Sequence, residues 1–62
     1  MSGFDDVQAV MLCEGMEEAE SEEHLIGAWQ HLIDTGLVWQ LQGWFGRTAE
    51  ALIDSGICHP KQ

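Results

Sequence analysis

The chain has 62 residues and a formal net charge of -9, with eleven Asp and Glu residues against two basic ones, Arg47 and Lys61. Such a surface repels phosphate groups, which disfavours direct binding to nucleic acid or to an anionic membrane. Hydrophobic residues make up 45% of the chain, which is too many for a disordered acidic tail. We therefore expect a single helical domain over residues 1–62.

The first helix is expected over residues 3–14, with Ser2 as its N-cap and Gly15 as its stop. Apolar residues lie along one side at helical spacing: Phe4, Val7, Val10 and Met11. We expect this side to pack across the other helices.

Residues 16–20 form an acidic linker, and a second helix is expected over residues 22–35 with Ser21 as its N-cap. One arc of this helix is apolar: Leu25, Ile26, Ala28, Trp29, Leu32 and Ile33. The opposite arc is predicted to face solvent: His24, Gly27, Gln30, His31 and Asp34.

The third helix is expected over residues 38–55, with Trp39 and Trp44 on the two shoulders of its apolar stripe and Gln42 inside it. A buried Gln42 amide would need hydrogen-bond partners from a neighbouring helix end or a second subunit. The tail, residues 59–62, is expected to fray because Pro60 cannot continue a helix.

Each helix is predicted to stop at a glycine that is followed by an apolar residue. The stops are Gly15, Gly36 and Gly56, and the apolar residue five positions before each follower completes a Schellman motif. Two stops are near copies, Leu-Ile-Asp-Thr-Gly-Leu over 32–37 and Leu-Ile-Asp-Ser-Gly-Ile over 52–57.

These elements predict an all-α, three-helix domain with helices over 3–14, 22–35 and 38–55. The short connection between the second and third helices favours an antiparallel pair. A core this small leaves apolar surface uncovered, which makes a homodimer plausible.

Two groups of residues are candidates for partner binding. Trp39, Trp44 and Gln42 could form an aromatic anchor, because Trp is enriched at the centres of interfaces. Glu17, Glu18 and Glu20 belong to an acidic cluster that either docks on a basic partner or is simply solvated, and helix-dipole stabilisation accounts for part of that cluster.

Nothing in the sequence indicates a catalytic, cofactor or metal site. Cys13, His24, His31, Cys58 and His59 lack the spacing of a zinc site, and no calcium-binding loop is present. No nucleophile, base and orienting group form a set, so we expect a protein that is not an enzyme and needs no cofactor.

The N-terminus has neither a basic start nor an apolar stretch, and no apolar run approaches a membrane span. We therefore expect a cytoplasmic protein with two free thiols. The sequence leaves open whether Cys13 and Cys58 ever pair.

The stretch from Gln30 to Gly43, continuing through Gly46-Arg47-Thr48-Ala49 to Leu52-Ile53, resembles a family of short proteins encoded by bacteriophages, whose function is unknown. The likeness extends to Cys13-Glu14-Gly15, where family members carry an aromatic residue before Glu-Gly. Trp44-Phe45 stands where the family favours a small residue and Tyr. The resemblance implies phage origin and action in the cytoplasm of a bacterial host, and it assigns no catalytic residue.

The sequence therefore predicts a non-catalytic phage accessory protein that binds a host or phage protein. One alternative is an acidic DNA mimic that inhibits a DNA-binding protein. Another is a helix-turn-helix regulator, although Arg47 is the only basic residue of the third helix.

Overall fold

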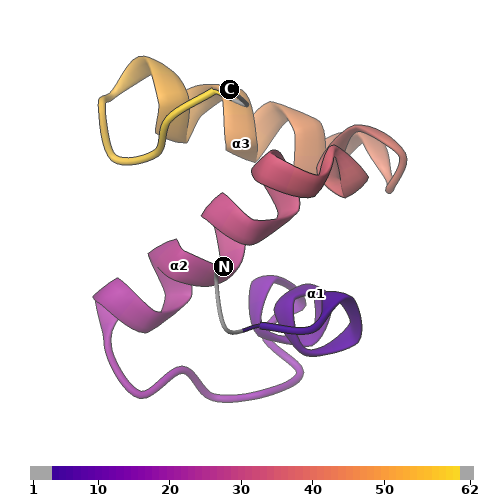
Figure 1. Ribbon diagram of the computed structural model, residues 1–62, viewed down its shortest axis with the longest axis vertical. Coiled ribbons are helices and arrows are strands. Elements are labelled where there is room, and N and C mark those ends of the chain that lie inside the picture. The colour runs from indigo at the N-terminus through magenta and orange to yellow at the C-terminus, as the bar shows by residue number, and fades with distance from the viewer. Residues whose placement is uncertain (1–3, 61–62) are drawn as a thin grey trace.

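The computed structural model describes residues 4–60, which form three α-helices and one short 3-10 helix and include no strand. The α-helices are α1 (Asp6–Glu14), α2 (Glu22–Thr35) and α3 (Gly43–Asp54), and the 3-10 helix η1 (Leu37–Trp39) lies between α2 and α3 (Figure 1). The predicted all-α, three-helix domain is confirmed.

The central element is α2, which contacts α1 and η1 (Figure 1). It contributes the most residues to the core because its apolar side chains fall on one arc. The buried hydrophobic residues are Ala9, Leu12, Ala28, Trp29, Leu32, Ile33, Val38, Phe45, Ala49 and Cys58.

The second and third helices do not form the expected antiparallel pair, because α3 lies across α2 (Figure 1). The connection between them is longer than predicted and contains η1, which contacts both α2 and α3. The rings of Trp29 on α2 and Phe45 on α3 lie close together, with centroids 5.9 Å apart, and this contact connects the two helices.

The start predicted for the third helix, Val38, is therefore wrong. The chain forms η1 after Gly36 and starts α3 only at Gly43, where the amide of Phe45 donates to the carbonyl of Gln42 at 2.9 Å. By contrast, α2 has its predicted bounds, and the hydroxyl of Ser21 caps it by accepting a hydrogen bond from the amide of His24 at 3.1 Å.

The first helix is shorter than predicted. It begins at Asp6, and a carboxylate oxygen of Asp5 accepts a hydrogen bond from the amide of Gln8 at 2.7 Å. Asp5 is thus the N-cap in the structure. The predicted cap Ser2 and the predicted first residue Gly3 lie outside the described residues.

Left-handed glycines follow all three helices, as predicted. The φ angles are 80° at Gly15, 78° at Gly36 and 84° at Gly56, a region that glycine enters without steric cost. After Gly15 and Gly56, the next amide donates to the carbonyl five residues earlier, at 2.9 Å from Met16 to Met11 and at 3.0 Å from Ile57 to Leu52. These two stops have the hydrogen-bond pattern of a Schellman motif.

The side of α1 that packs against α2 differs from the predicted one. Ala9 and Leu12 are buried, whereas Val7 is 69% exposed. Apolar residues occur on both sides of this helix, so the spacing alone could not select the buried side. Packing against α2 determines that the side with Ala9 and Leu12 is the buried one.

The arc of α2 that was expected to face solvent is partly covered by the chain before α1. The ring of Phe4 stacks on His24, with ring centroids 5.3 Å apart, and approaches the backbone of Gly27 so closely that a Cβ there would lie 3.1 Å from Cε2 of Phe4. His31 is buried, and its Nε2 lies 2.8 Å from a carboxylate oxygen of Asp6. The expectation of a solvated His31 is wrong because α1 and the segment before it pack over this arc.

The first residue of the tail expected to fray is held by α2. The side-chain amide of Gln30 accepts a hydrogen bond from the His59 amide at 2.8 Å and donates one to the His59 carbonyl at 2.9 Å. This contact brings the chain after α3 back to α2, while Lys61 and Gln62 lie outside the described residues.

Candidate partner-binding surface

Two exposed tryptophans flank the start of α3. Trp44 is 36% exposed, and its ring stacks on Phe45 with a centroid separation of 3.9 Å. Trp39 is 49% exposed and lies against Gly46, where an added Cβ would be 3.5 Å from its ring. Both side chains are therefore held in place by α3 while they present aromatic surface to solvent.

Gln42 precedes α3 and is exposed, so its predicted place inside an apolar arc is wrong. Its side-chain oxygen accepts a hydrogen bond from the indole Nε1–H of Trp44 at 3.1 Å. The structure therefore brings Gln42 and Trp44 together, as parts of one surface at the beginning of α3.

The acidic linker is a separate surface. Glu17, Glu18 and Glu20 are exposed, and none of them forms an ion pair with another described residue. The linker lies between α1 and α2 at the bottom of Figure 1, whereas α3 lies at the top. The two groups of residues predicted to bind a partner therefore do not form one continuous site.

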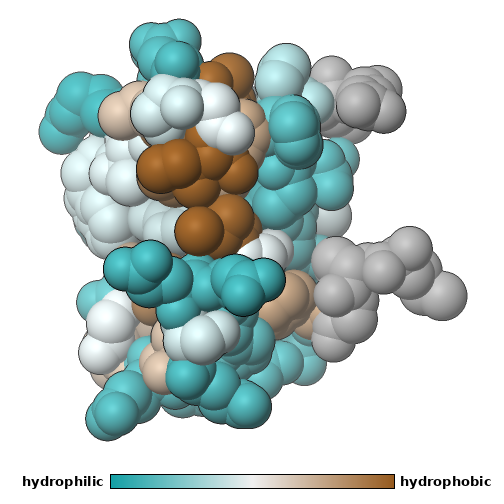
Figure 2. Space-filling model, turned by 90° about the vertical axis from the view of Figure 1, so that its left-hand side faces the viewer, coloured by the Kyte–Doolittle hydropathy of each residue, from teal (hydrophilic) through white to brown (hydrophobic). Residues whose placement is uncertain are grey.

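A hydrophobic patch occupies the face shown in Figure 2, where brown side chains in the upper half are bordered by hydrophilic ones on the right and by side chains of intermediate hydropathy on the left. This face includes the C-terminal end of α3 and the turn after it, where Ile57 is 48% exposed. Single exposed apolar residues are normal on small proteins, so the patch by itself defines no site.

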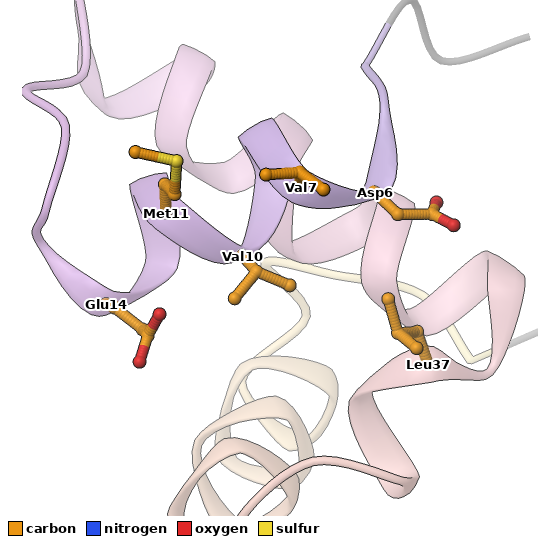
Figure 3. Close-up of a pocket in the computed structure, with 6 residues that line it drawn as sticks. All are labelled: Asp6, Val7, Val10, Met11, Glu14 and Leu37. Carbon is orange, nitrogen blue, oxygen red and sulfur yellow. The ribbon is translucent and has the colours of Figure 1, made fainter.

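An open apolar groove lies between α1 and η1. It has a volume of about 350 Å³ and is lined by Asp6, Val7, Val10, Met11, Glu14 and Leu37 (Figure 3). Asp6 and Glu14 lie at opposite ends of α1, with the apolar side chains between them. The sequence did not reveal this groove, because three of its side chains were assigned to the core. The feature of the sequence that could have indicated the groove is the second apolar side of α1.

Residues 6–62 match the model of a protein family that is described as a domain of unknown function, DUF7417. The chain belongs to the DUF7417 family. The match begins at the first residue of α1, so the groove, α3 and the turn after it all belong to the shared domain. No curated protein and no solved structure matches the chain.

The thiols of this DUF7417 domain are free. Burial raises the pKa of Cys13 to about 12, and the nearby negative charge of an ionised Cys58 adds to the rise. Burial also raises the pKa of Cys58, with a further contribution from Asp34. Thiols with raised pKa values are weak nucleophiles at neutral pH.

Two other kinds of feature, a metal site and a membrane-spanning helix, are not found among residues 4–60. No group of three or more His, Cys, Asp or Glu side chains is arranged to hold a metal ion in this part of the chain. None of its helices has the length and hydropathy that a bilayer crossing requires. The surfaces that remain are the exposed tryptophans, the acidic linker and the groove along α1.

Proposed function

We propose that this DUF7417 domain is a non-catalytic phage accessory protein that acts in the cytoplasm of a bacterial host by binding a host or phage protein. The observation that carries the proposal is the pair of tryptophans at the start of α3. A large aromatic side chain that is held in position yet exposed loses little conformational entropy on binding, which is the usual character of an interface anchor.

The contacts of Trp44 support this role. Its ring stacks on Phe45, meets Trp29 edge-on at a centroid distance of 6.3 Å and donates its indole hydrogen to Gln42. These three contacts hold the ring against α2 and α3 while part of it stays accessible. The phage origin rests on the resemblance of the block from Leu32 to Arg47.

The test is affinity purification of the tagged protein from bacteria infected by the phage that encodes it. We expect one protein to be enriched with the wild-type chain and to fall at least tenfold with Trp44→Ala, as for a central interface residue. Gln40→Ala is the matched control, since Gln40 is exposed and lies outside the tryptophan contacts. Circular dichroism must show that each variant is folded.

Recovery of nothing above the untagged background in infected cells would refute the proposal. Equal recovery with Trp44→Ala, Trp39→Ala and wild type would retain a binding function but remove the tryptophans from it. The readout therefore separates the existence of a partner from the site that binds it.

The acidic DNA mimic is a second candidate, favoured by the exposure of all eleven acidic side chains. Six of them lie between Glu14 and Glu23, and the others lie on α1 or before it and on α2 and α3. Mimicry would require that the captured partner bind DNA and that excess duplex DNA release it. A captured protein that DNA does not displace would dismiss this candidate.

A further inference from the structure

We propose that the groove between α1 and η1 binds an amphipathic helix of a partner protein, with apolar side chains in the groove and a basic side chain at each end. This inference rests on the proposed function and names the chemistry of the partner at a surface distinct from the tryptophans. Three observations carry it: the apolar lining, the acidic ends and the spacing between them.

The lining is apolar and accessible. Val7, Val10 and Met11 recur on α1 with the i, i+3, i+4 spacing of one helical stripe, and Leu37 of η1 faces them across the groove (Figure 3). Val7 is among the most exposed large hydrophobic residues of the chain. A stripe of this kind matches the apolar stripe of a second helix.

The two ends of the groove are acidic. The Asp6 side chain is 63% exposed, and its hydrogen bond to His31 fixes its position. Glu14 is exposed at the last residue of α1. Among residues 4–60 no basic side chain lines the groove, so a partner with positive charges at both ends complements it.

The spacing defines the partner further. Asp6 and Glu14 are eight residues apart on one helix, which corresponds to a rise of about 12 Å. A partner helix with two basic residues the same number of positions apart, and apolar residues between them, matches this length.

Two other occupants fit the groove less well. A second copy of the chain would set Asp6 and Glu14 against the same carboxylates, and like charges at an interface are unfavourable. A small apolar molecule would leave much of its surface in water, because pockets for such ligands enclose most of the ligand and this groove is open.

The experiment uses the whole protein and a synthetic amphipathic peptide of about 16 residues, long enough to form a helix. The peptide carries leucines along one stripe between two lysines eight positions apart. A control peptide has glutamates in place of the lysines. Binding is measured by titration calorimetry, and the site is located from ¹⁵N chemical-shift changes.

We expect the lysine peptide to bind, the glutamate peptide not to bind and the shift changes to fall on α1 and Leu37. Glu14→Lys should weaken binding about tenfold, because it replaces an attractive pair with a repulsive one. Glu50→Lys changes the net charge by the same amount from α3 and should leave the affinity within about twofold. Val7→Ser should also weaken binding about tenfold, through lost apolar burial.

Failure of the lysine peptide to bind, or equal binding of both peptides, would overturn the inference. Shift changes centred on Trp39 and Trp44 would also overturn it while leaving the proposed function intact. Sedimentation that shows a dimer broken by Val7→Ser would assign the groove to a second copy instead. If the cellular partner is captured equally by wild type and Glu14→Lys, the function stands and the groove is not its site.

Discussion

Residues 32–37 and 52–57 are near copies in sequence, and both end a helix at a glycine with positive φ. Their surroundings differ. In the first copy Leu32 and Ile33 are completely buried, whereas in the second Leu52 and Ile53 are only partly buried. The same side chains therefore contribute differently to stability, because apolar burial depends on what packs around them.

The backbone also follows a different path after each of the two glycines. After Gly36, the amide of Leu37 donates to the hydroxyl of Thr35 at 3.4 Å, and the chain continues into η1. After Gly56, the amides of Ile57 and Cys58 both donate to the carbonyl of Leu52 at 3.0 Å.

Both copies nevertheless bury the second residue after the glycine, which is Val38 in one case and Cys58 in the other. The local sequence ends the helix in each copy, and the surrounding structure sets the path that follows.

The largest expected difference between the copies is in their leucines. Leu32→Ala should lower the free energy of unfolding by about 3–4 kcal/mol, since it opens a cavity at the centre of the core. Leu52→Ala should cost about 1–2 kcal/mol, because its side chain is only partly buried. Chemical denaturation measures both, and equal losses would mean that burial does not distinguish the copies.

The glycines should behave alike. Gly36→Ala and Gly56→Ala should each cost about 1–2 kcal/mol, because an alanine is strained at these φ angles. Gly46→Ala is the matched control, since Gly46 lies within α3 and a Cβ there meets Trp39 at an ordinary contact distance. That variant should be neutral or stabilising by up to about 1 kcal/mol. The two alanine variants are compared by thermal melts. If the losses of stability in Gly36→Ala and Gly56→Ala differ by much more than about 1 kcal/mol, the loss does not have a purely local origin.

The hydroxyls before the glycines should differ modestly. Thr35 donates to the carbonyls of His31 and Leu32 and accepts from Leu37, whereas Ser55 donates to Leu52. Thr35→Ala should cost about 1 kcal/mol and Ser55→Ala about half as much. Thr35→Ser keeps the hydroxyl and should restore most of the stability in the same denaturation assay. Equal losses in the two alanine variants would show that the extra hydrogen bonds of Thr35 add nothing.

The last effect is confined to alkaline pH and concerns Cys58, the buried thiol that follows the second copy, together with Cys13. Burial raises the pKa of Cys13 to about 12 and raises that of Cys58, while an unfolded thiol ionises near its ordinary pKa of 9.0. The unfolded chain therefore loses protons first, and stability that is fully present below pH 9 declines as the pH rises toward 12.

Cys58→Val imitates Val38 of the first copy and should make this decline shallower in melting temperatures measured against pH. Cys13→Val should have the same effect on the slope. An unchanged slope in both variants would exclude the thiols as its cause.

The sequence predicted the features that neighbouring residues determine. The bounds of α2 and its cap at Ser21 follow from one apolar arc and one hydroxyl, and the three glycine stops follow from the left-handed conformation. Trp44 is exposed at the start of α3, whereas the predicted place of Trp39 on the same helix is wrong, because Trp39 lies in η1.

Packing between distant segments decided the rest. The crossing of α2 and α3 depends on η1, the burial of His31 depends on Phe4 and Asp6, and the groove exists because α1 buries Ala9 and Leu12 rather than Val7. Helix stops are local hydrogen-bond patterns and can be read from a few residues. The buried side of a helix with two apolar sides depends on which neighbour covers it, and only the tertiary structure supplies that neighbour.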